Sequence, residues 1–483
     1  MTPLKIGTAE IVFFISLAIT FGAAFIARVR SGRQSRDEDL AGRSLNRWLV
    51  GLSAGTTGNS GFIVTGAVGL GYAGGIHWLL LPLSWLLGDL VFWTLFPARL
   101  NRLAREANAT TLSEMLTFNL TGKFARATSV IVALLLVTFL ATYTAAQWLA
   151  GKKFLSGMFE LSDLTALIVF AATIIAYSSL GGFRGSVYTD FVQAIVRMLG
   201  TVIALVAVTW FALHNTSNFS RNIAAAGGDF LHFFPNGTII SAAGFVFGYA
   251  AAAVGFGLGQ PQIVSRYFAG KSPEETRASM WIYIGFLQAT WIAMTLFGVL
   301  LRGVMPGIAD PETGLSVFFQ KDISAIATGI IFADVFATIA STSNGILVAM
   351  SQALLRDLFG RKEEGRGFLA RLLTPITTIL LGIFTIALSL VLPGTVFSIA
   401  VDSLSKIGAG VAGAVLIKAL GWRHTSFSLF ISVVAGISAA LVWTYLGYDG
   451  LFNGAGVGIA SSLLTNWVFR AFGSEKTLEK TTA

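Results

Sequence analysis

Four polar residues in one apolar stretch have the type and spacing of ligands for a monovalent cation. The stretch is Ile331–Met350, IFADVFATIASTSNGILVAM, and one face of a helix there would carry Asp334, Thr338, Ser341 and Thr342. Hydroxyl oxygens, joined by carbonyls of an unwound neighbouring helix, suit sodium without holding a strong charge. The alternative is that these hydroxyls only bond to their own helix or to a neighbouring one.

The partner stretch is Gly51–Gly75, GLSAGTTGNSGFIVTGAVGLGYAGG, which is apolar but rich in glycine. It carries four clustered polar residues, namely Thr56, Thr57, Asn59 and Ser60. Glycine and short polar side chains let the backbone leave helical geometry, and lipid tolerates this only where the freed carbonyls face protein or a cavity. We therefore predict an interrupted transmembrane helix that would offer carbonyl ligands near the middle of the bilayer.

A third stretch places an acid inside the membrane. In Gly181–Gln193, GGFRGSVYTDFVQ, a glycine turn opens a helix that contains Asp190. A carboxylate within a membrane helix is costly and indicates function by default. The alternative is a helix cap or an ion pair with Arg184 or Arg197.

Two later stretches could contribute to a binding site between helices. Ala251–Gln262, AAAVGFGLGQPQ, is rich in glycine and ends near a proline, which predicts either another interrupted helix or close helix packing. In FSIAVDSLSKIGAG, Asp402 and Lys406 are spaced to pair on one helix face. This pair is interpreted either as a structural ion pair or as a contact for a solute or a proton.

The composition requires a membrane protein. Of the 483 residues, 54% are apolar and only 12% are charged, with a mean hydropathy of +0.74, so the chain could not cover a soluble surface with polar groups. With no cysteine, no GxxxxGK[ST] loop and four scattered histidines, nothing predicts a thiolate metal site, an ATPase or another enzyme. We expect no catalytic residue, no organic cofactor and no nucleic-acid partner.

Apolar stretches long enough to cross a bilayer predict an all-α polytopic protein with about 13 transmembrane helices. The stretches lie near residues 8–28, 46–71, 76–98, 125–150, 162–180, 187–213, 238–260, 277–301, 324–354, 369–392, 396–420, 427–446 and 450–470. With the N-terminus outside, most of the 33 lysines and arginines fall in inner connections, which also explains the net charge of +9. The C-terminus is therefore predicted to be cytoplasmic.

The ordered motifs resemble those of the sodium/solute symporter family, most closely its sodium/proline symporter branch. The likeness runs through nearly the whole chain, in AGRSLNRWLVGLSAG, SSLGGFRGSVYTDFVQ, GLGQPQIVSRYFAG and ATIASTSNGILVAMSQALLRDLF. This resemblance implies an inverted five-plus-five helix repeat core with broken first and sixth core helices. It divides a single integral membrane transporter domain, 1–483, into a leading helix and inner loop (1–45), a first core repeat (46–215), a second core repeat (238–420), two trailing helices (427–470) and a cytoplasmic tail (471–483).

By position, the resemblance also implies an ion site. The implied sodium ligands are the backbones of Thr56, Asn59 and Thr338 and the hydroxyls of Ser341 and Thr342. Asp190 matches the family's acid near that site, and Ser60 matches a serine near the coupled sites of the proline branch.

The implied solute site departs from that of the proline branch. Gly58 lies where that branch has an aspartate, and Ala253 and Gly257 lie where it has a tryptophan and a tyrosine, which indicates a larger or differently shaped solute than proline. Asp402 aligns with a glutamine of the family's sugar transporters, which favours a charged or zwitterionic solute, such as an amino acid or a carboxylate-like compound. The predicted solute-binding residues are Thr57, Gly58, Ala253, Phe256, Gly257, Asp402 and Lys406.

The resulting prediction is a secondary active symporter that couples inward sodium flow to uptake of a small organic solute by alternating access in the cell (inner) membrane. Its partners would be the solute and the lipid bilayer, and no oligomeric state is predicted. The main alternative is proton coupling through Asp190, Asp334 and Asp402, because buried carboxylates can carry protons. A transporter-like membrane sensor and a passive channel are further alternatives.

Overall fold

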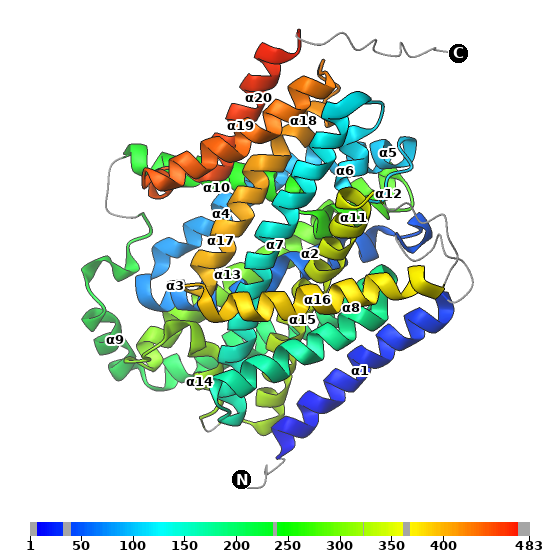
Figure 1. Cartoon of the computed structure of the whole chain (residues 1–483). Helices are drawn as coiled ribbons and strands as arrows, with labels where there is room; N and C mark the ends of the chain where they lie inside the picture. The colour runs from blue at the N-terminus through cyan, green and yellow to red at the C-terminus, as the bar shows by residue number, and fades with distance from the viewer. Residues whose placement is uncertain (1–6, 32–39, 235–238, 322, 361–367, 472–483) are drawn as a thin grey trace.

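The computed structural model describes residues 7–31, 40–234, 239–321, 323–360 and 368–471 (Figure 1). Regular structure in these ranges is helical. The α-helices are α1 (Thr8–Ser31), α2 (Arg47–Val64), α3 (Gly66–Gly74), α4 (Leu80–Leu95), α5 (Pro97–Glu106), α6 (Leu112–Thr117), α7 (Gly122–Phe159), α8 (Asp163–His214), α9 (Thr216–Ala225), α10 (Ile239–Gly259), α11 (Pro261–Phe268), α12 (Pro273–Ala278), α13 (Met280–Val304), α14 (Gly314–Phe319), α15 (Ala325–Gln352), α16 (Phe368–Val391), α17 (Val396–Ile407), α18 (Gly413–Ala419), α19 (Ser426–Tyr445) and α20 (Gly454–Phe469). The predicted tail lies outside the described residues from position 472 onward.

Nine helical segments within these ranges are long and apolar enough to cross a membrane. They are Ile76–Leu95, Gly122–Phe159, Gly182–His214, Ile239–Gly259, Pro273–Val304, Ala325–Leu358, Leu372–Val391, Val396–Ala419 and Ser426–Tyr445. Two shorter apolar segments, Thr8–Ala23 and Asp163–Ala176, coincide with further predicted spans. The all-α polytopic fold is confirmed, whereas the count of 13 and the inverted repeat stay predictions.

The first predicted interruption is present in α2. Ser60 has φ 53° and ψ 169°, which breaks the helix directly after Asn59. A non-glycine residue in such a conformation costs about 1–3 kcal/mol and persists only where its surroundings hold it. Here Ser60 Oγ accepts from the N–H of Phe62 at 3.2 Å, and the N–H of Gly61 donates to Gln147 Oε1 at 2.8 Å. The side chain of Gln147 on α7 thus satisfies the backbone at the break.

A second interruption separates α10 from α11. Gln260 has an extended backbone, with φ −87° and ψ 104°, and Pro261 then begins α11, where its missing N–H costs no hydrogen bond. Of the two alternatives for this stretch, the interrupted helix is therefore confirmed. The helix α8 also turns, at Gly182, where φ is 57° and only glycine adopts the conformation without strain.

The two ends of the bundle carry different connections. Figure 1 shows α5, α6, α11 and α12 at one end, and α9 and α14 at the opposite end. The first, which we call the arginine-rich end, includes Arg99, Arg102 and Arg105 and is the end predicted to face inside. The helix α6 begins there with a capping box, in which Thr111 and Glu114 each accept from the other's backbone N–H.

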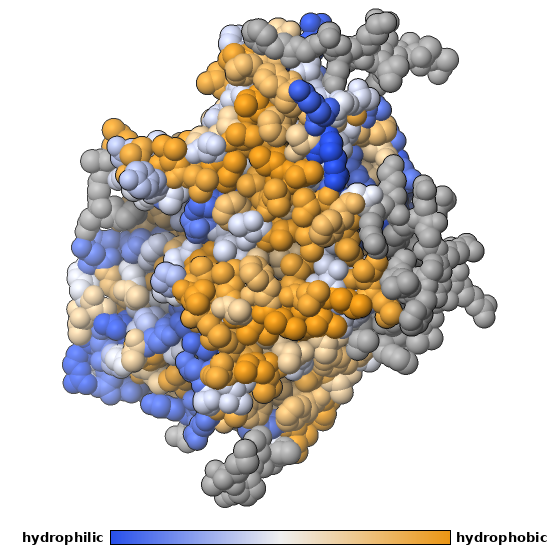
Figure 2. Space-filling model, viewed as in Figure 1, coloured by the Kyte–Doolittle hydropathy of each residue, from blue (hydrophilic) through white to orange (hydrophobic). Residues whose placement is uncertain are grey.

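An apolar band covers the side of the bundle. On α16, Leu380 and Ile383 are 62% and 57% exposed, and α8 exposes Leu199 and Val206 in the same way. Figure 2 shows hydrophobic residues over the broad middle of this face, with hydrophilic residues gathered toward the lower left, where α9 lies. An exposed apolar surface of this extent fits contact with lipid.

The helices α3 and α13 meet through reciprocal glycine contacts. A Cβ added to Gly71 would lie 2.2 Å from the carbonyl oxygen of Thr295, and one added to Gly298 would lie 2.1 Å from that of Val68. Both distances exclude any side chain, so the two backbones touch directly. The contact fixes the second half of the broken helix to α13.

At the end of the bundle that carries α9, one buried carboxylate joins a loop to the start of α17. Glu312 accepts from the N–H groups of Val396 and Phe397 at the start of α17, both at 3.2 Å. It also pairs with Lys153 at 2.6 Å, and Lys153 in turn pairs with Asp310 at 2.7 Å. A carboxylate at a helix N-terminus is favourable, so the loop that contains Glu312 is held against α17.

Candidate functional site

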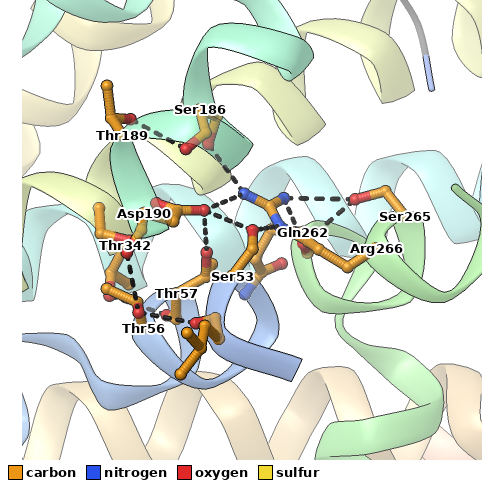
Figure 3. Close-up of polar contacts among 12 residues, drawn as sticks. Ser53, Thr56, Thr57, Ser186, Thr189, Asp190, Gln262, Ser265, Arg266 and Thr342 are labelled. Carbon is orange, nitrogen blue, oxygen red and sulfur yellow. Dashed lines mark hydrogen bonds and ion pairs between the residues drawn. The ribbon is translucent and has the colours of Figure 1, made fainter. Parts of the chain in front are cut away.

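Asp190 of α8 is the centre of a buried hydrogen-bond network (Figure 3). Its Oδ1 accepts from Ser341 Oγ at 2.6 Å. Its Oδ2 accepts from Ser53 Oγ at 2.6 Å and from Thr57 Oγ1 at 3.3 Å, and lies 3.2 Å from Arg266 Nη2. Because both charged groups are buried, charge pairing and the surrounding hydroxyls replace water.

Arg266 belongs to α11, which follows the break at Gln260. Figure 3 shows its guanidinium pointing toward Asp190. The alternative in which Asp190 pairs with Arg184 or Arg197 was therefore wrong, because a helix 76 residues further along the chain supplies the cation. Arg266 also donates to Ser53 Oγ (3.1 Å), Ser186 Oγ (2.8 Å), the Gln262 carbonyl oxygen (2.5 Å) and Ser265 Oγ (3.4 Å).

Ser341 and Thr342 of α15 reach two different helices. Ser341 donates to Asp190 on α8, as described above. Thr342 Oγ1 donates to the carbonyl oxygen of Thr57 on α2 at 2.8 Å, and it lies 3.5 Å from the carbonyl oxygen of Thr338 on its own helix. These two hydroxyls therefore join α15 to α8 and to α2 just before the break.

The remaining predicted ion ligands on α2 have engaged side chains. Thr56 Oγ1 donates to the carbonyl oxygen of Leu52 at 2.7 Å and to that of Asp190 at 3.3 Å. Asn59 Nδ2 donates to Thr290 Oγ1 on α13 at 2.6 Å. These bonds orient the backbone of α2 directly before Ser60, while the role of that backbone in ion binding stays a prediction.

The oxygens brought together here fit a monovalent cation. Two hydroxyls, on Ser341 and Thr342, lie against carbonyl oxygens of Thr57 and Thr338 and one carboxylate oxygen of Asp190. Among the described residues, no group of three or more histidine, cysteine, aspartate or glutamate residues could hold a metal ion. Hydroxyl and carbonyl oxygens with a single acid are the donors that hard cations prefer.

Aromatic residues gather beside the break in α2. A Cβ added to Gly58 would lie 3.5 Å from the ring of Phe256 and 3.7 Å from the hydroxyl of Tyr283. The ring of Phe256 lies 5.5 Å from that of Trp85, which lies 5.6 Å from that of Trp291. Neither tryptophan was predicted as a site residue, because the stretches that form α4 and α13 show only the composition of apolar spans.

Two side chains next to these aromatics have unpaired polar atoms. Trp85 Nε1 and both amide atoms of Gln288 are buried without a hydrogen-bond partner. Gln288 lies one helical turn before Trp291 on α13. Unpaired buried polar groups are costly, and a polar solute would satisfy them. Trp85 and Gln288 are therefore candidate solute contacts.

Ala253 and Gly257 face α4. A Cβ added to Gly257 would lie 2.7 Å from the ring of Phe92, and one added to Gly88 would lie 2.6 Å from Ala253 Cβ. The helix α4 therefore fills the volume that these two small residues leave. The structure places them in a helix contact, whereas Phe256 next to them faces the break in α2.

Asp402 and Lys406 form the predicted ion pair on α17. The side chain of Asp402 is 51% exposed and that of Lys406 only 9%, so the carboxylate has a free side for a further partner. Ser403 shares a hydrogen bond of 2.8 Å with Thr142, which fixes this part of α17 to α7.

The structure is a helical membrane bundle in which two broken helices contact buried hydroxyls and an acid. This arrangement is typical of a class of secondary active transporters. The structure of a Na+-coupled sialic acid symporter aligns with a TM-score of 0.80 at 16% identity, over 97% of this chain and 98% of that one. MhsT in complex with L-phenylalanine aligns with a TM-score of 0.54 at 16% identity, over 87% and 98%. These structures show that the fold is shared.

The chain belongs to the sodium:solute symporter family, whose model matches residues 40–436. The sodium/proline symporter of Escherichia coli is 27% identical over 90% of this chain and 88% of its own length. The sodium/pantothenate symporter of Haemophilus influenzae is 26% identical over 91% and 90%, and the osmoregulated proline transporter OpuE of Bacillus subtilis is 24% identical over 90% and 89%. The predicted family and the function class, sodium-coupled solute symport across a membrane, are confirmed.

Proposed function

We propose that sodium binds where α2 meets α15. The proposed ligands are the hydroxyls of Ser341 and Thr342 and the backbone oxygens of Thr56, Asn59 and Thr338, with Asp190 and Ser60 close by. The observation that carries this proposal is that both hydroxyls contact oxygens of other helices, at 2.6 and 2.8 Å. A cation placed among these oxygens would exchange hydroxyl-to-oxygen hydrogen bonds for ion contacts with little helix movement.

In this proposal the bound sodium ties α2 to α15, and the two ends of the bundle open in turn. The pair of Asp190 and Arg266 holds α8 to α11, and Glu312 at the opposite end holds its loop to the start of α17. The arginine-rich end would face the cytoplasm, with the N-terminus outside and the C-terminus inside, in a cell (inner) membrane. The division into a leading helix, two core repeats and two trailing helices is part of the same proposal.

The proposed solute is an amino acid or a carboxylate-like compound. Phe256 and the two tryptophans near Gly58 offer apolar surface, while Gln288 offers unpaired polar atoms. Thr57 and Gly58 line the break, and Asp402 with Lys406 offers both signs of charge. Relatives are named for proline and for pantothenate, and both of these solutes carry a carboxylate. Ala253 and Gly257 would act through their packing on α4.

Asp402→Asn is expected to weaken solute affinity about tenfold while leaving sodium affinity within about twofold. The substitution removes a half-exposed charge but keeps its shape, and the Ser341 and Thr342 contacts lie on another helix. The measurement is the solute concentration for half-maximal uptake into proteoliposomes, followed by a sodium titration at saturating solute. An equal loss in both titrations, or in neither, would remove Asp402 from the solute site.

Sodium alone is expected to stabilise the purified protein against heat. A ligand that binds only the folded state at 100 times its dissociation constant adds about 2.7 kcal/mol to the free energy of unfolding. The measurement is thermal unfolding in sodium chloride and in choline chloride at equal ionic strength, repeated over a range of pH. A higher melting temperature in sodium supports the proposed site.

Proton coupling was the main alternative in the sequence, and the same experiment tests it at the proposed site. A melting temperature that does not change with sodium but changes with pH would favour protons as the coupling ion. Each predicted proton carrier has a cationic partner. Asp190 pairs with Arg266, Asp334 with Arg197, and Asp402 with Lys406. Because these charges are already compensated, sodium is the favoured coupling ion.

A further inference from the structure

A second buried ion pair lies beside the proposed sodium site, two helical turns from Asp190 along α8. Arg197 Nη1 contacts Asp334 Oδ2 at 2.8 Å, and both side chains are only 1% exposed. The pair joins α8 to α15, the helix that carries both proposed hydroxyl ligands. Neither charge is needed to compensate Asp190, which is paired with Arg266.

Each member of the pair holds the side chain of a proposed sodium ligand. Arg197 Nε donates to Asn59 Oδ1 at 3.3 Å, and Asp334 Oδ1 accepts from Thr338 Oγ1 at 3.2 Å. The other side of the Asn59 amide donates to Thr290 on α13. The last residue before the break in α2 is therefore held from both sides.

The carboxylate of Asp334 is also confined on the side that faces α8. A Cβ added to Gly200 would lie 2.3 Å from Asp334 Oδ2, so the backbone of α8 passes directly against the carboxylate. Any side chain at position 200 would push it aside. The spacing of α8 and α15 is thus set at the ion pair itself.

Stability does not account for this arrangement. Burial of two charges in a membrane protein costs desolvation, and replacement of such pairs by apolar residues is often neutral or stabilising. Arg197 Nη2 is buried without a hydrogen-bond partner, so the pair is incompletely satisfied. A costly pair that contacts two proposed ion ligands indicates a functional role.

We propose that Arg197 and Asp334 are positioning residues for the sodium site, which fix Asn59 of α2 and Thr338 of α15 at the spacing that the ion requires. The proposal rests on the proposed sodium site and adds two residues that do not touch the ion. The pair links α8 to α15 directly and to α2 through Asn59. Its loss weakens sodium binding even where the fold is intact.

The test is a sodium titration of thermal stability with purified full-length variants, in which choline replaces sodium. The double variant Arg197→Met with Asp334→Asn removes both charges together, so its melting temperature in choline is expected to stay near that of the parent. Its half-saturating sodium concentration is expected to rise about tenfold, because Asn59 loses its anchor. Arg197→Lys keeps the charge but loses the Nε bond, and a smaller rise of about threefold is expected.

Two further variants distinguish an effect on the positioning role from an effect on the sodium site itself. Lys418→Met removes a half-buried cation that donates to the carbonyl oxygen of Phe118 at the arginine-rich end and lies 3.4 Å from His424 Nε2, and it should titrate like the parent. Ser341→Ala with Thr342→Ala tests the sodium site itself. If that variant loses the sodium response while both Arg197 variants keep the parental value, the sodium site stands and the positioning role is overturned. If the alanine variant keeps the parental response, the ligand set and the positioning role are both overturned.

Discussion

Replacement of Ser341 and Thr342 together by alanine is expected to raise the sodium concentration for half-maximal uptake at least about tenfold, or about 1.4 kcal/mol. The two hydroxyls contact oxygens on α8 and α2, so their removal deletes two proposed ion ligands together with the two hydrogen bonds that they make to those helices. The measurement is sodium-driven uptake of the proposed amino acid or carboxylate solute into proteoliposomes, with sodium varied at constant ionic strength.

Ser343→Ala provides the matched control. Ser343 is the next residue, is also buried, and donates only to the carbonyl oxygen of Ile339 on its own helix, at 2.8 Å. We expect its sodium dependence to match that of the parent protein. An unchanged half-maximal concentration in the double variant, or an equal rise in Ser343→Ala, would contradict the assignment.

Asp190→Asn is expected to have the larger effect, a fall in uptake rate of about a hundredfold or more at saturating sodium. The carboxylate accepts from Ser341, Ser53 and Thr57 and compensates Arg266. A neutral amide leaves Arg266 buried without a counter-charge, and loss of one partner of a buried pair costs about 3–5 kcal/mol. Uptake must therefore be normalised to the folded protein in the membrane.

The double variant Asp190→Asn with Arg266→Gln distinguishes a loss of stability from a loss of transport. Because both charges are absent, its melting temperature is expected to recover toward that of the parent, while transport stays low. Full recovery of transport would show that the pair is only structural. Asp357→Asn serves as a second control, because that buried acid binds Thr111 at the arginine-rich end and lies outside the network of Asp190.

Most of the fold could be predicted because it follows from local composition. The break in α2 occurs at Ser60, within the polar cluster where glycine and short side chains weaken the helix. The break before Pro261 follows equally from residue type. Span limits agree to within a few residues for α16 and α19, since apolar length alone decides them.

The partners within the site could not be predicted, because they depend on how distant helices meet. From the sequence, Arg266 is expected in a connection between spans. It reaches Asp190 only because α11 takes a new direction after Gln260. Arg197 and Asp334 lie on separate helices, and nothing in either stretch indicates their contact. The spacing rules that found Asp402 and Lys406 apply only within one helix.

The glycine contacts between α3 and α13 also have a mechanical consequence. Because their backbones touch at Gly71 and Gly298, the two helices have no side-chain layer between them to deform and should move as one lever. The strained backbone at Ser60 lies between that lever and the first part of α2, which carries the proposed ion ligands Thr56 and Asn59. Because Asn59 also donates to Thr290 on α13, ion binding at Asn59 would act on this lever directly through that hydrogen bond as well as through the break.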